Sequence, residues 1–457
     1  MLKEQIRNKS NELLEDTIKE IQRLVKVKSV RDEAGIKENL PFGSDVDNAL
    51  NEFVKMADEK GFRTYKDPKG YYAYAEVGPE TGKLIGILGH VDVVPEGDEK
   101  LWTEGKPFDA RIVNEKIIGR GSLDDKGPVV INMMAIKLLM DLNYEFKSRV
   151  RIIVGGSEET TWECIDKYKE EQEIPTISYS PDSNFPLINA EKTVFQFTCS
   201  HSIDCPFTVI GGNAFNAVPD SCEYIGPNID DVCKELDKLG YEYKKTDKGI
   251  ITLGKAAHAM ECYKGINAVT NMAEALFNAD IHSETIDFIA KYIKDTKHGE
   301  LIYNPLIEDN VSGKLTLNIG KINIQNNKEE ISCDMRVPVL ANFDEVKEQI
   351  KTIVQANGLE FDEASILEKL YVDEKSFLVS TLLNVYKEVT NDAEAKPLSS
   401  GGATYSRAWD NCVAFGMVFR KQGMIDKMHQ ANECLEIKFI QPALEIYANA
   451  IYQLDQE

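Results

Sequence analysis

A histidine and a carboxylate at alternate positions follow an apolar segment in the first quarter of the chain. The segment 84–88 predicts a buried strand, and His90 and Asp92 come where that strand ends. Side chains two residues apart in an extended chain point the same way. A metal-bound imidazole usually has its other ring N–H fixed by a partner, so His90 is predicted as a ligand and Asp92 as the acid that orients it. Taken alone, such a pair is also common at the surface end of a strand.

Two acidic pairs add further candidates. Asp124 and Asp125 lie in the glycine-flanked turn 119–127, and Glu158 and Glu159 follow a strand predicted at 149–154. A lone Glu-Glu pair is typical of a helix N-terminus, where negative charge is favoured. Beside other acids at one sheet edge, one glutamate can bind metal while the other moves a proton. Glu159 is therefore predicted as a ligand and Glu158 as the general base.

Two later residues are less specific. Asp182 follows a strand predicted at 176–180, but Pro181-Asp182-Ser183 is also ordinary turn sequence, and the residues leave the two interpretations evenly balanced. Three predicted strands thus end in a histidine or an acid, and ligands bind at the carboxyl ends of strands in open α/β sheets. His429 stands alone, and a lone late histidine is more often structural.

The elements that must position these residues alternate between helix and strand. Apolar spacing predicts helices at 11–27, 44–61 with Ser44 as cap, 127–142, 376–390 and 440–454, and strands at 62–66, 71–77, 83–89 and 412–419. The middle is β-rich, with strands at 193–198, 249–253 and 314–324 and helices at 265–277 and 343–356. We therefore predict an α/β fold: a mixed sheet covered by helices, built from 1–189 and 376–457, with an α+β lid inserted at 190–375. No internal repeat is evident.

Composition limits the classes of function. A chain of 457 residues predicts two domains, and its net charge of −23 argues against nucleic acid or an anionic membrane as partner. Nine scattered cysteines without a C-x-x-C motif indicate neither a disulfide framework nor a zinc ribbon. The N-terminus lacks an apolar leader, and no run of apolar residues is long enough to cross a bilayer. We expect a soluble cytoplasmic protein.

Taken together, the motifs resemble the aminoacylase and carboxypeptidase group of di-metal peptidases. The matching motifs are His90-x-Asp92, Gly119-Arg120-Gly121 through Asp124-Asp125-Lys126-Gly127, Glu158-Glu159, Ser180-Pro181-Asp182 and His429. Within this group, the segments 180–186, 191–192 and 401–407 resemble the PepV-type dipeptidases. The resemblance covers nearly the whole chain. One departure is Ser157, where relatives often carry aspartate.

The resemblance implies roles for individual residues. Asp124 would bridge two divalent metal ions, His90 and Asp182 would complete one site, and Glu159 and His429 the other. A cis peptide bond would follow Asp124. Substrate contacts would come from Asn216, His258, Arg336, Gly401 and Gly402. Without the resemblance, Asn216, His258 and Arg336 are ordinary turn, loop and surface residues.

The predicted reaction is metal-dependent hydrolysis of a dipeptide. Glu158 would take a proton from a water held between the ions, and His258 and one metal would stabilise the oxyanion. Arg336 and the Gly401-Gly402 backbone would hold the substrate carboxylate. Zn²⁺ is favoured, with Mn²⁺ or Co²⁺ as alternatives, because affinity order and availability decide the metal.

Two alternative functions and one assembly follow from the same residues. A deacylase of N-acyl amino acids would share the metal chemistry. A non-catalytic metal-binding interaction protein would need neither Glu158 nor Asp92, which counts against it. The insertion at 190–375 is long enough for two lid-sized units. The PepV-type enzymes use such a lid to mimic a missing partner, so we predict a monomer in which His258 serves its own chain.

Overall fold

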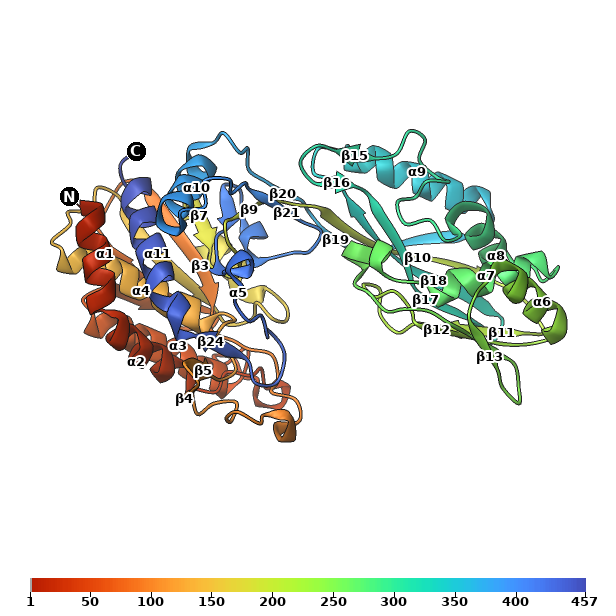
Figure 1. Ribbon diagram of the computed structural model, residues 1–457, viewed down its shortest axis with the longest axis horizontal. Helices are drawn as coiled ribbons and strands as arrows, with labels where there is room; N and C mark the ends of the chain where they lie inside the picture. Colours follow the sequence, from red (N-terminus) through yellow and green to blue (C-terminus); the bar gives the residue numbers. More distant parts are fainter. Residues whose placement is uncertain (1) are drawn as a thin grey trace. The chain divides into compact units, whose positions relative to one another are not determined.

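The computed structural model describes residues 2–457, which divide into two compact units (Figure 1). Unit 1 contains the chain up to Asn189, Val372–Leu398 and Thr404–Glu457. Unit 2 contains Ala190–Tyr371 and Ser399–Ala403.

A mixed sheet with the order β1-β2-β6-β3-β7-β22 forms the centre of unit 1. Its strands are β1 (Arg63–Lys66), β2 (Tyr72–Val77), β3 (Leu84–His90), β6 (Arg149–Gly155), β7 (Ile177–Ser180) and β22 (Cys412–Ala414). The strands β6, β3, β7 and β22 are parallel to one another, whereas β2 is antiparallel to both of its neighbours, β1 and β6. Every residue of β3 and β6 is buried, as expected for parallel strands covered on both faces. The predicted mixed α/β sheet is confirmed.

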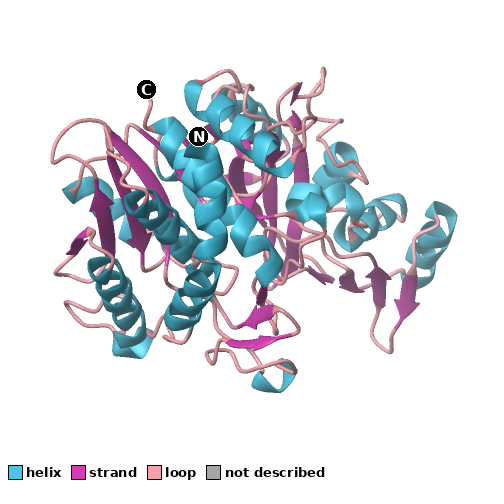
Figure 2. Ribbon diagram, turned by 60° about the vertical axis from the view of Figure 1, so that its left-hand side comes forward, coloured by secondary structure: helices cyan, strands magenta, loops and turns pink. Residues whose placement is uncertain are grey.

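Helices cover both faces of this sheet. They are α1 (Leu2–Glu12), α2 (Leu14–Val25), α3 (Ser44–Glu59), α4 (Lys126–Asp141), α5 (Glu163–Glu171), α10 (Phe377–Thr390) and α11 (Ile440–Leu454). On one face α4 lies so close that a Cβ on Gly89 would meet Val129 at 2.5 Å. On the other face Ile165 and Tyr168 of α5 cluster with Leu88. The two termini lie near each other because α1 packs beside α11 (Figures 1 and 2).

Two predicted helix boundaries are wrong in detail. The helix expected at 11–27 is α2, but it begins at Leu14, because a separate helix that was not predicted, α1, extends to Glu12. Ser44 does not cap α3. Gly43 holds the cap position with φ of 89°, and a Cβ there would meet Asp32 at 2.9 Å. Only glycine suits that conformation and that close approach.

Short strands complete unit 1. A three-stranded sheet contains β4 (Arg111–Val113), β5 (Lys116–Ile118) and β24 (Cys434–Glu436), and a two-stranded one contains β8 (Ser183–Asn184) and β23 (Met417–Val418). Where the chain passes between the units lie β9 (Ile188–Glu191), β20 (Leu370–Tyr371) and β21 (Leu398–Ser400).

Unit 2 has an antiparallel sheet of order β13-β14-β12-β11-β17-β18-β10-β19. Its strands are β10 (Thr193–Ser202), β11 (Thr208–Gly211), β12 (Ser221–Ile225), β13 (Tyr243–Lys245), β14 (Ile250–Leu253), β17 (Thr316–Gln325), β18 (Lys328–Val337) and β19 (Glu360–Leu367). Its helices are α6 (Ile229–Leu239), α7 (Ala268–Asn278), α8 (Glu284–Phe288) and α9 (Phe343–Ala356), and a small hairpin joins β15 (Glu308–Asp309) to β16 (Gly313–Lys314). Apolar side chains of these helices and of alternate strand positions share one core.

The sheet of unit 2 repeats one plan twice. The hairpin β11-β12 is followed by α6 and the edge strand β13, and the hairpin β17-β18 is followed by α9 and the edge strand β19. The two sets of four strands meet at the antiparallel pair β11–β17. The repeat lies in the topology, which explains why the sequence shows none.

The predicted insertion, 190–375, differs from unit 2 at two places. Val372–Lys375 belong to unit 1, where the Val372 N–H donates to the Asn189 carbonyl at 2.9 Å. Ser399–Ala403 belong to unit 2, because Arg336 Nη1 donates to the Gly401 carbonyl at 2.9 Å. Among the helices of residues 2–457, none combines the length and apolar character needed to cross a membrane.

Candidate metal centre and active site

Three neighbouring parallel strands deliver candidate ligands to one edge of the unit 1 sheet. His90 is the last residue of β3, Glu159 follows β6, and Asp182 follows β7. Parallel strands end at the same edge, so these residues meet there. Asp124 lies in the turn before α4, and His429 lies in the loop before β24. The expected cis peptide bond, Asp124-Asp125, is present.

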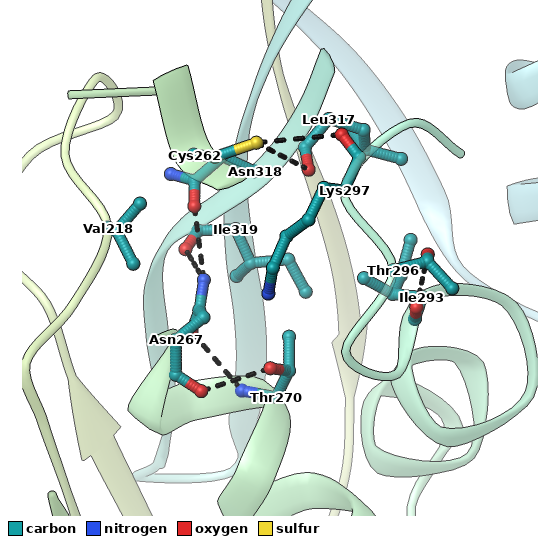
Figure 3. A pocket seen from close by; sticks show the side chains of 10 residues that line it. All are labelled: Val218, Cys262, Asn267, Thr270, Ile293, Thr296, Lys297, Leu317, Asn318 and Ile319. Carbon is teal, nitrogen blue, oxygen red and sulfur yellow. Dashed lines mark hydrogen bonds between the residues drawn. The ribbon is translucent and has the colours of Figure 1, made fainter. Parts of the chain in front are cut away.

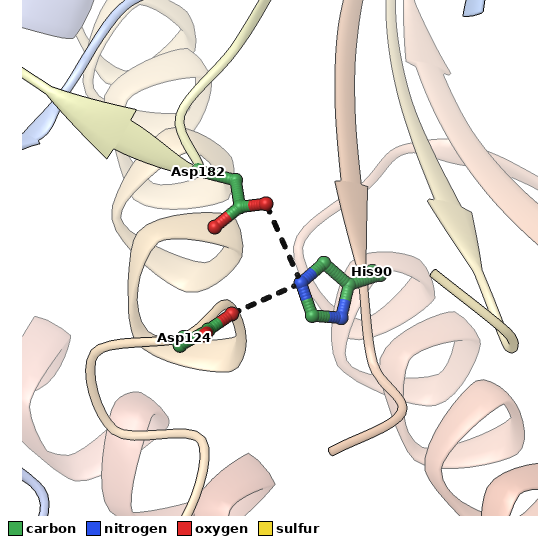
Figure 4. A group of neighbouring side chains, drawn as sticks. All are labelled: His90, Asp124 and Asp182. Atoms are coloured by element: carbon green, nitrogen blue, oxygen red, sulfur yellow. Dashed lines mark ion pairs between the residues drawn. The ribbon is translucent and has the colours of Figure 1, made fainter. Parts of the chain in front are cut away.

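The first group of ligand atoms comes from His90, Asp124 and Asp182 (Figure 4). His90 Nε2 lies 3.2 Å from Asp124 Oδ1 and 3.8 Å from Asp182 Oδ2. Nε2 is buried and has no hydrogen-bond partner among the described residues. An unpartnered imidazole nitrogen that faces two carboxylate oxygens suits a cation between them.

The second group shares Asp124 with the first. His429 Nε2 lies 3.0 Å from Asp124 Oδ2 and 3.1 Å from Glu159 Oε2. In each group one ligand atom per residue lies within 4.8 Å of the others. Asp124 thus turns one oxygen toward each histidine, which is the arrangement of a bridging carboxylate.

The separations fit metal coordination. Ligand atoms about 2.0–2.2 Å from a tetrahedral zinc ion lie roughly 3.4 Å from one another. The distances in both groups, 3.0 to 3.8 Å, bracket that value. Histidine nitrogens and carboxylate oxygens are also the donors that Zn²⁺ and Mn²⁺ accept. The residues therefore fit two divalent ions.

Electrostatics also favour cations here. Burial lowers the pKa of His90, but Asp124 and Asp92 raise it more, so the net pKa lies well above its usual value. Asp124 and Glu159 raise the pKa of His429 to about 10. Burial and the neighbouring Asp124 raise the pKa of Asp182 to about 7. These shifts show an excess of negative charge that positive charge would relieve.

Asp92 connects the imidazole to the acidic pair. His90 Nδ1 lies 3.0 Å from the Asp92 carbonyl oxygen and 3.5 Å from its Oδ1. Nδ1 therefore carries the proton, which leaves Nε2 as the atom available to a metal ion. The same carboxylate accepts the N–H groups of Glu158 and Glu159, both at 3.1 Å. Ser157, the departure from the family pattern, accepts the Cys164 N–H on its hydroxyl at 3.1 Å.

Glu158 lies among the ligands but joins neither group. Burial raises its pKa well above the usual value, and Asp182 and Glu159 raise it further, while His90 opposes them. A carboxylate whose pKa is raised in this way holds a proton more readily than a free one. Glu158 is the residue predicted as the general base.

A residue that the sequence did not reveal organises the turn of Asp124. Glu433 is fully buried and accepts the N–H groups of Gly121, Leu123 and Asp124 at 3.0, 3.0 and 3.2 Å. Arg120 Nη1 donates to its other oxygen at 2.6 Å. These partners lie 309–313 residues away in the chain, so no local pattern could indicate them.

Unit 2 brings the predicted substrate residues together. The Ala259 N–H donates to the Asn216 carbonyl at 2.9 Å, which places the exposed Asn216 beside His258. His258 Nδ1 accepts the Met260 N–H at 3.2 Å, so the neutral ring carries its proton on Nε2. Burial and then Arg336 lower the pKa of His258.

Arg336 is not the surface residue that its sequence context suggested. It is buried, and it donates from Nε and Nη2 to Asp334 at 2.6 and 2.8 Å and from Nη1 to the carbonyl of Gly401. The neighbouring Gly402 N–H donates to the Ser400 hydroxyl at 2.9 Å. Of five N–H groups on a guanidinium, three have these partners.

Two asparagines that the sequence analysis missed support the loop of Asn216. Asn267 Nδ2 donates to Asn318 Oδ1 at 3.1 Å, and Asn318 Nδ2 donates to the Ala217 carbonyl at 2.9 Å. Both side chains line a small cavity that β17 borders (Figure 3). The asparagines fix the backbone from which Asn216 and His258 extend.

A sheet edge with two adjoining candidate ligand groups and a half-buried glutamate beside them has the composition of a metal-assisted hydrolase site. The chain belongs to peptidase family M20/M25/M40, whose model matches residues 86–453. A protein of Staphylococcus aureus (strain MW2) with the provisional name dipeptidase is 33% identical over 478 residues, which covers 99% of each protein. The family resemblance seen in the sequence is confirmed, and the chain is a hydrolase of the peptidase class.

Solved structures share the fold. Human carnosine dipeptidase 1 matches with a TM-score of 0.59 and 13% identity, over 100% of this chain and 99% of that one. A di-peptidase from Saccharomyces cerevisiae matches with a TM-score of 0.58 and 14% identity, over 100% and 99%. A dinuclear metal-binding peptidase of the same family from Bacillus subtilis has a TM-score of 0.53 and 12% identity, over 98% and 99%.

Proposed function

We propose that this chain is a dipeptidase of the PepV type that depends on two divalent metal ions, with Zn²⁺ favoured over Mn²⁺ and Co²⁺. The observation that carries the proposal is the pair of ligand groups that share Asp124, with the half-buried Glu158 beside them. The dipeptidase names of the Staphylococcus aureus relative and of two structural neighbours support a dipeptide as substrate.

The residues divide the chemical work. His90, Asp124 and Asp182 would hold one ion, and Asp124, Glu159 and His429 the other. When bound, such ions polarise a carbonyl and lower the pKa of water. Glu158 accepts a proton from the attacking water and returns it to the leaving amine. Asp92 keeps His90 in the ligating tautomer and holds the backbone of Glu158.

Unit 2 would supply the substrate contacts. In the neutral ring, His258 Nε2–H is the donor available to an oxyanion, since Nδ1 accepts from Met260. Arg336 has two N–H groups beyond the three already described, and these would bind the substrate carboxylate beside Gly401 and Gly402. Asn216, next to His258, would complete the contacts.

Assembly and location belong to the same proposal. The doubled plan of the unit 2 sheet supports a monomer, because one chain contains two equivalent sets of strands. The nine cysteines of the chain all lie in its described part and form no disulfide. Free cysteines suit the proposed location in the cytoplasm, where thiols stay reduced.

A substrate panel tests the proposed function. Metal-reconstituted protein is given free dipeptides, the same dipeptides with an N-acetyl group, and N-acetyl amino acids. We expect hydrolysis of free dipeptides and none of the acetylated compounds. Turnover of N-acetyl amino acids alone would instead identify a deacylase, and metal binding without turnover of any compound would identify a non-catalytic protein.

A further inference from the structure

One buried carboxylate links the two segments that carry Asp124 and His429. Glu433 Oε1 accepts three N–H groups of the turn that leads into α4, those of Gly121, Leu123 and Asp124. The third of these belongs to the shared ligand residue itself. Since the Glu433 side chain has no exposure to solvent, water cannot replace these bonds when they are lost.

The link runs in both directions. Arg120 Nη1 donates to Glu433 Oε2 at 2.6 Å and to the Gln430 carbonyl at 3.3 Å, next to His429. The Gly119 N–H donates to the Glu433 carbonyl at 3.0 Å. The Arg120 guanidinium lies over the ring of Trp102 at 5.4 Å, which holds it in place. A side chain of each segment therefore bonds to the backbone of the other: Glu433 to the turn 119–124, and Arg120 to the loop 429–433. These two are called the tied segments below.

The two ligand groups depend on this link to different degrees. In the group Asp124, Glu159 and His429, two of the three ligands lie on tied segments. In the group His90, Asp124 and Asp182, only Asp124 does, because His90 ends β3 and Asp182 follows β7, and these two strands pair within the sheet.

We propose that Glu433 is a positioning residue that fixes Asp124 relative to His429 and thereby sets the affinity for the metal ion of the His429 group, more than for that of the His90 group. This inference rests on the proposed function, since both groups must bind ions. If Glu433 only stabilised the fold, its substitution would lower the affinity for both ions equally or for neither.

The test is metal binding by the full chain with Glu433→Gln. The glutamine keeps the size of the side chain and one carbonyl oxygen, but its amide nitrogen would face the Arg120 donor. Metal-stripped protein is titrated with Zn²⁺ in competition with a chelating dye, which gives the number of ions and each dissociation constant. The His429→Ala variant, measured in parallel, identifies which ion belongs to the His429 group.

Glu76→Gln is the matched control. Glu76 is also buried and accepts from Arg151 Nε at 2.8 Å and from Arg63 Nη2 at 2.9 Å, between β2 and its neighbours and without a bond to either tied segment. The Glu76→Gln substitution removes a carboxylate of similar burial. The melting temperatures of the two variants therefore report the general loss of stability.

We expect Glu433→Gln to lower the affinity for the ion of the His429 group by about 10- to 100-fold, the range for loss of a group that orients metal ligands. The affinity for the other ion should change several-fold less. Glu76→Gln should leave both dissociation constants unchanged. The inference would be overturned if Glu433→Gln lowered the affinity for both ions equally. It would also be overturned if the variant had a lower melting temperature but unchanged dissociation constants.

A second variant covers the case in which Glu433→Gln does not fold. Arg120→Lys keeps the charge but cannot donate to Glu433 and Gln430 in the same fork geometry. Arg120→Lys should lower the affinity for the ion of the His429 group, and an unchanged affinity would overturn the inference. If the parent protein binds no divalent ion, the proposed function fails and this inference fails with it, an outcome distinct from those above.

Discussion

The carboxylate of Asp92 accepts the backbone N–H of Glu158 at 3.1 Å. Its second oxygen accepts the N–H of Glu159 at 3.1 Å, and its carbonyl oxygen lies 3.0 Å from His90 Nδ1. One residue thus holds the proposed base, one ligand of the second group and the ring of a ligand of the first. Its contribution is to orientation, because no atom of Asp92 belongs to either ligand group.

We predict that Asp92→Asn lowers metal affinity and kcat together. The amide nitrogen of asparagine cannot accept the N–H that one carboxylate oxygen now accepts, so the Glu158-Glu159 turn must shift. Loss of such a partner costs about 10- to 100-fold in metal affinity or activity. Zinc titration and steady-state kinetics check it, and parent-like values for both would contradict the assigned role.

Glu158→Ala should remove turnover and leave the metal in place. Glu158 is assigned proton transfer, which contributes about 10²–10⁴-fold to rate, and it supplies no atom to either ligand group. His90→Ala and Asp124→Ala should instead lose metal. Metal analysis beside kinetics distinguishes them, and a Glu158→Ala protein that has lost its ions would show that Glu158 is a ligand.

Chelation should abolish activity reversibly. Both ligand groups consist only of histidine and carboxylate side chains, which release divalent ions to a strong chelator. We expect activity to fall to background after metal removal and to return with Zn²⁺, Mn²⁺ or Co²⁺. Full activity in protein shown by metal analysis to be metal-free would rule out the proposed chemistry.

The strand ends were predictable from sequence because their signals are local. A strand pattern followed closely by a histidine or an acid gave β3 with His90 and β7 with Asp182, and α4 begins within one residue of its predicted start. Ser44 misled because it stands where a cap is expected, while the glycine before it supplies the required φ.

The rest of the site depends on contacts between distant segments. Nothing near His429 indicated that it meets Asp124, and only the family resemblance suggested it. Glu433 gave no signal, because its partners lie in the turn before α4. Arg336 looked exposed at a strand end. Its pairing with Asp334 on the same strand offsets the desolvation cost of burying its charge. The doubled plan of unit 2 is likewise a property of strand order alone.

The pKa of His258 should move in opposite directions in two variants. Burial and then Arg336 lower it, whereas Asp334 raises it. Arg336→Met should therefore raise the pKa toward its ordinary value of 6.5, and Asp334→Asn should lower it further. NMR titration of the His258 ring measures both. Because the parent pKa is below 6.5, the ring stays neutral to lower pH, and Arg336→Met should protonate at higher pH.

The last prediction concerns which chain His258 serves. If unit 2 already contains both sets of strands that a dimer would bring together, the enzyme is a monomer and His258 acts on the metal centre of its own chain. A mixture of His258→Ala and Glu158→Ala proteins, each inactive alone, should then stay inactive, and light scattering should give the mass of one chain. A dimer that donates His258 across subunits would form hybrid sites with both residues intact. Recovery of activity on mixing, or a stable dimer, would overturn the monomer.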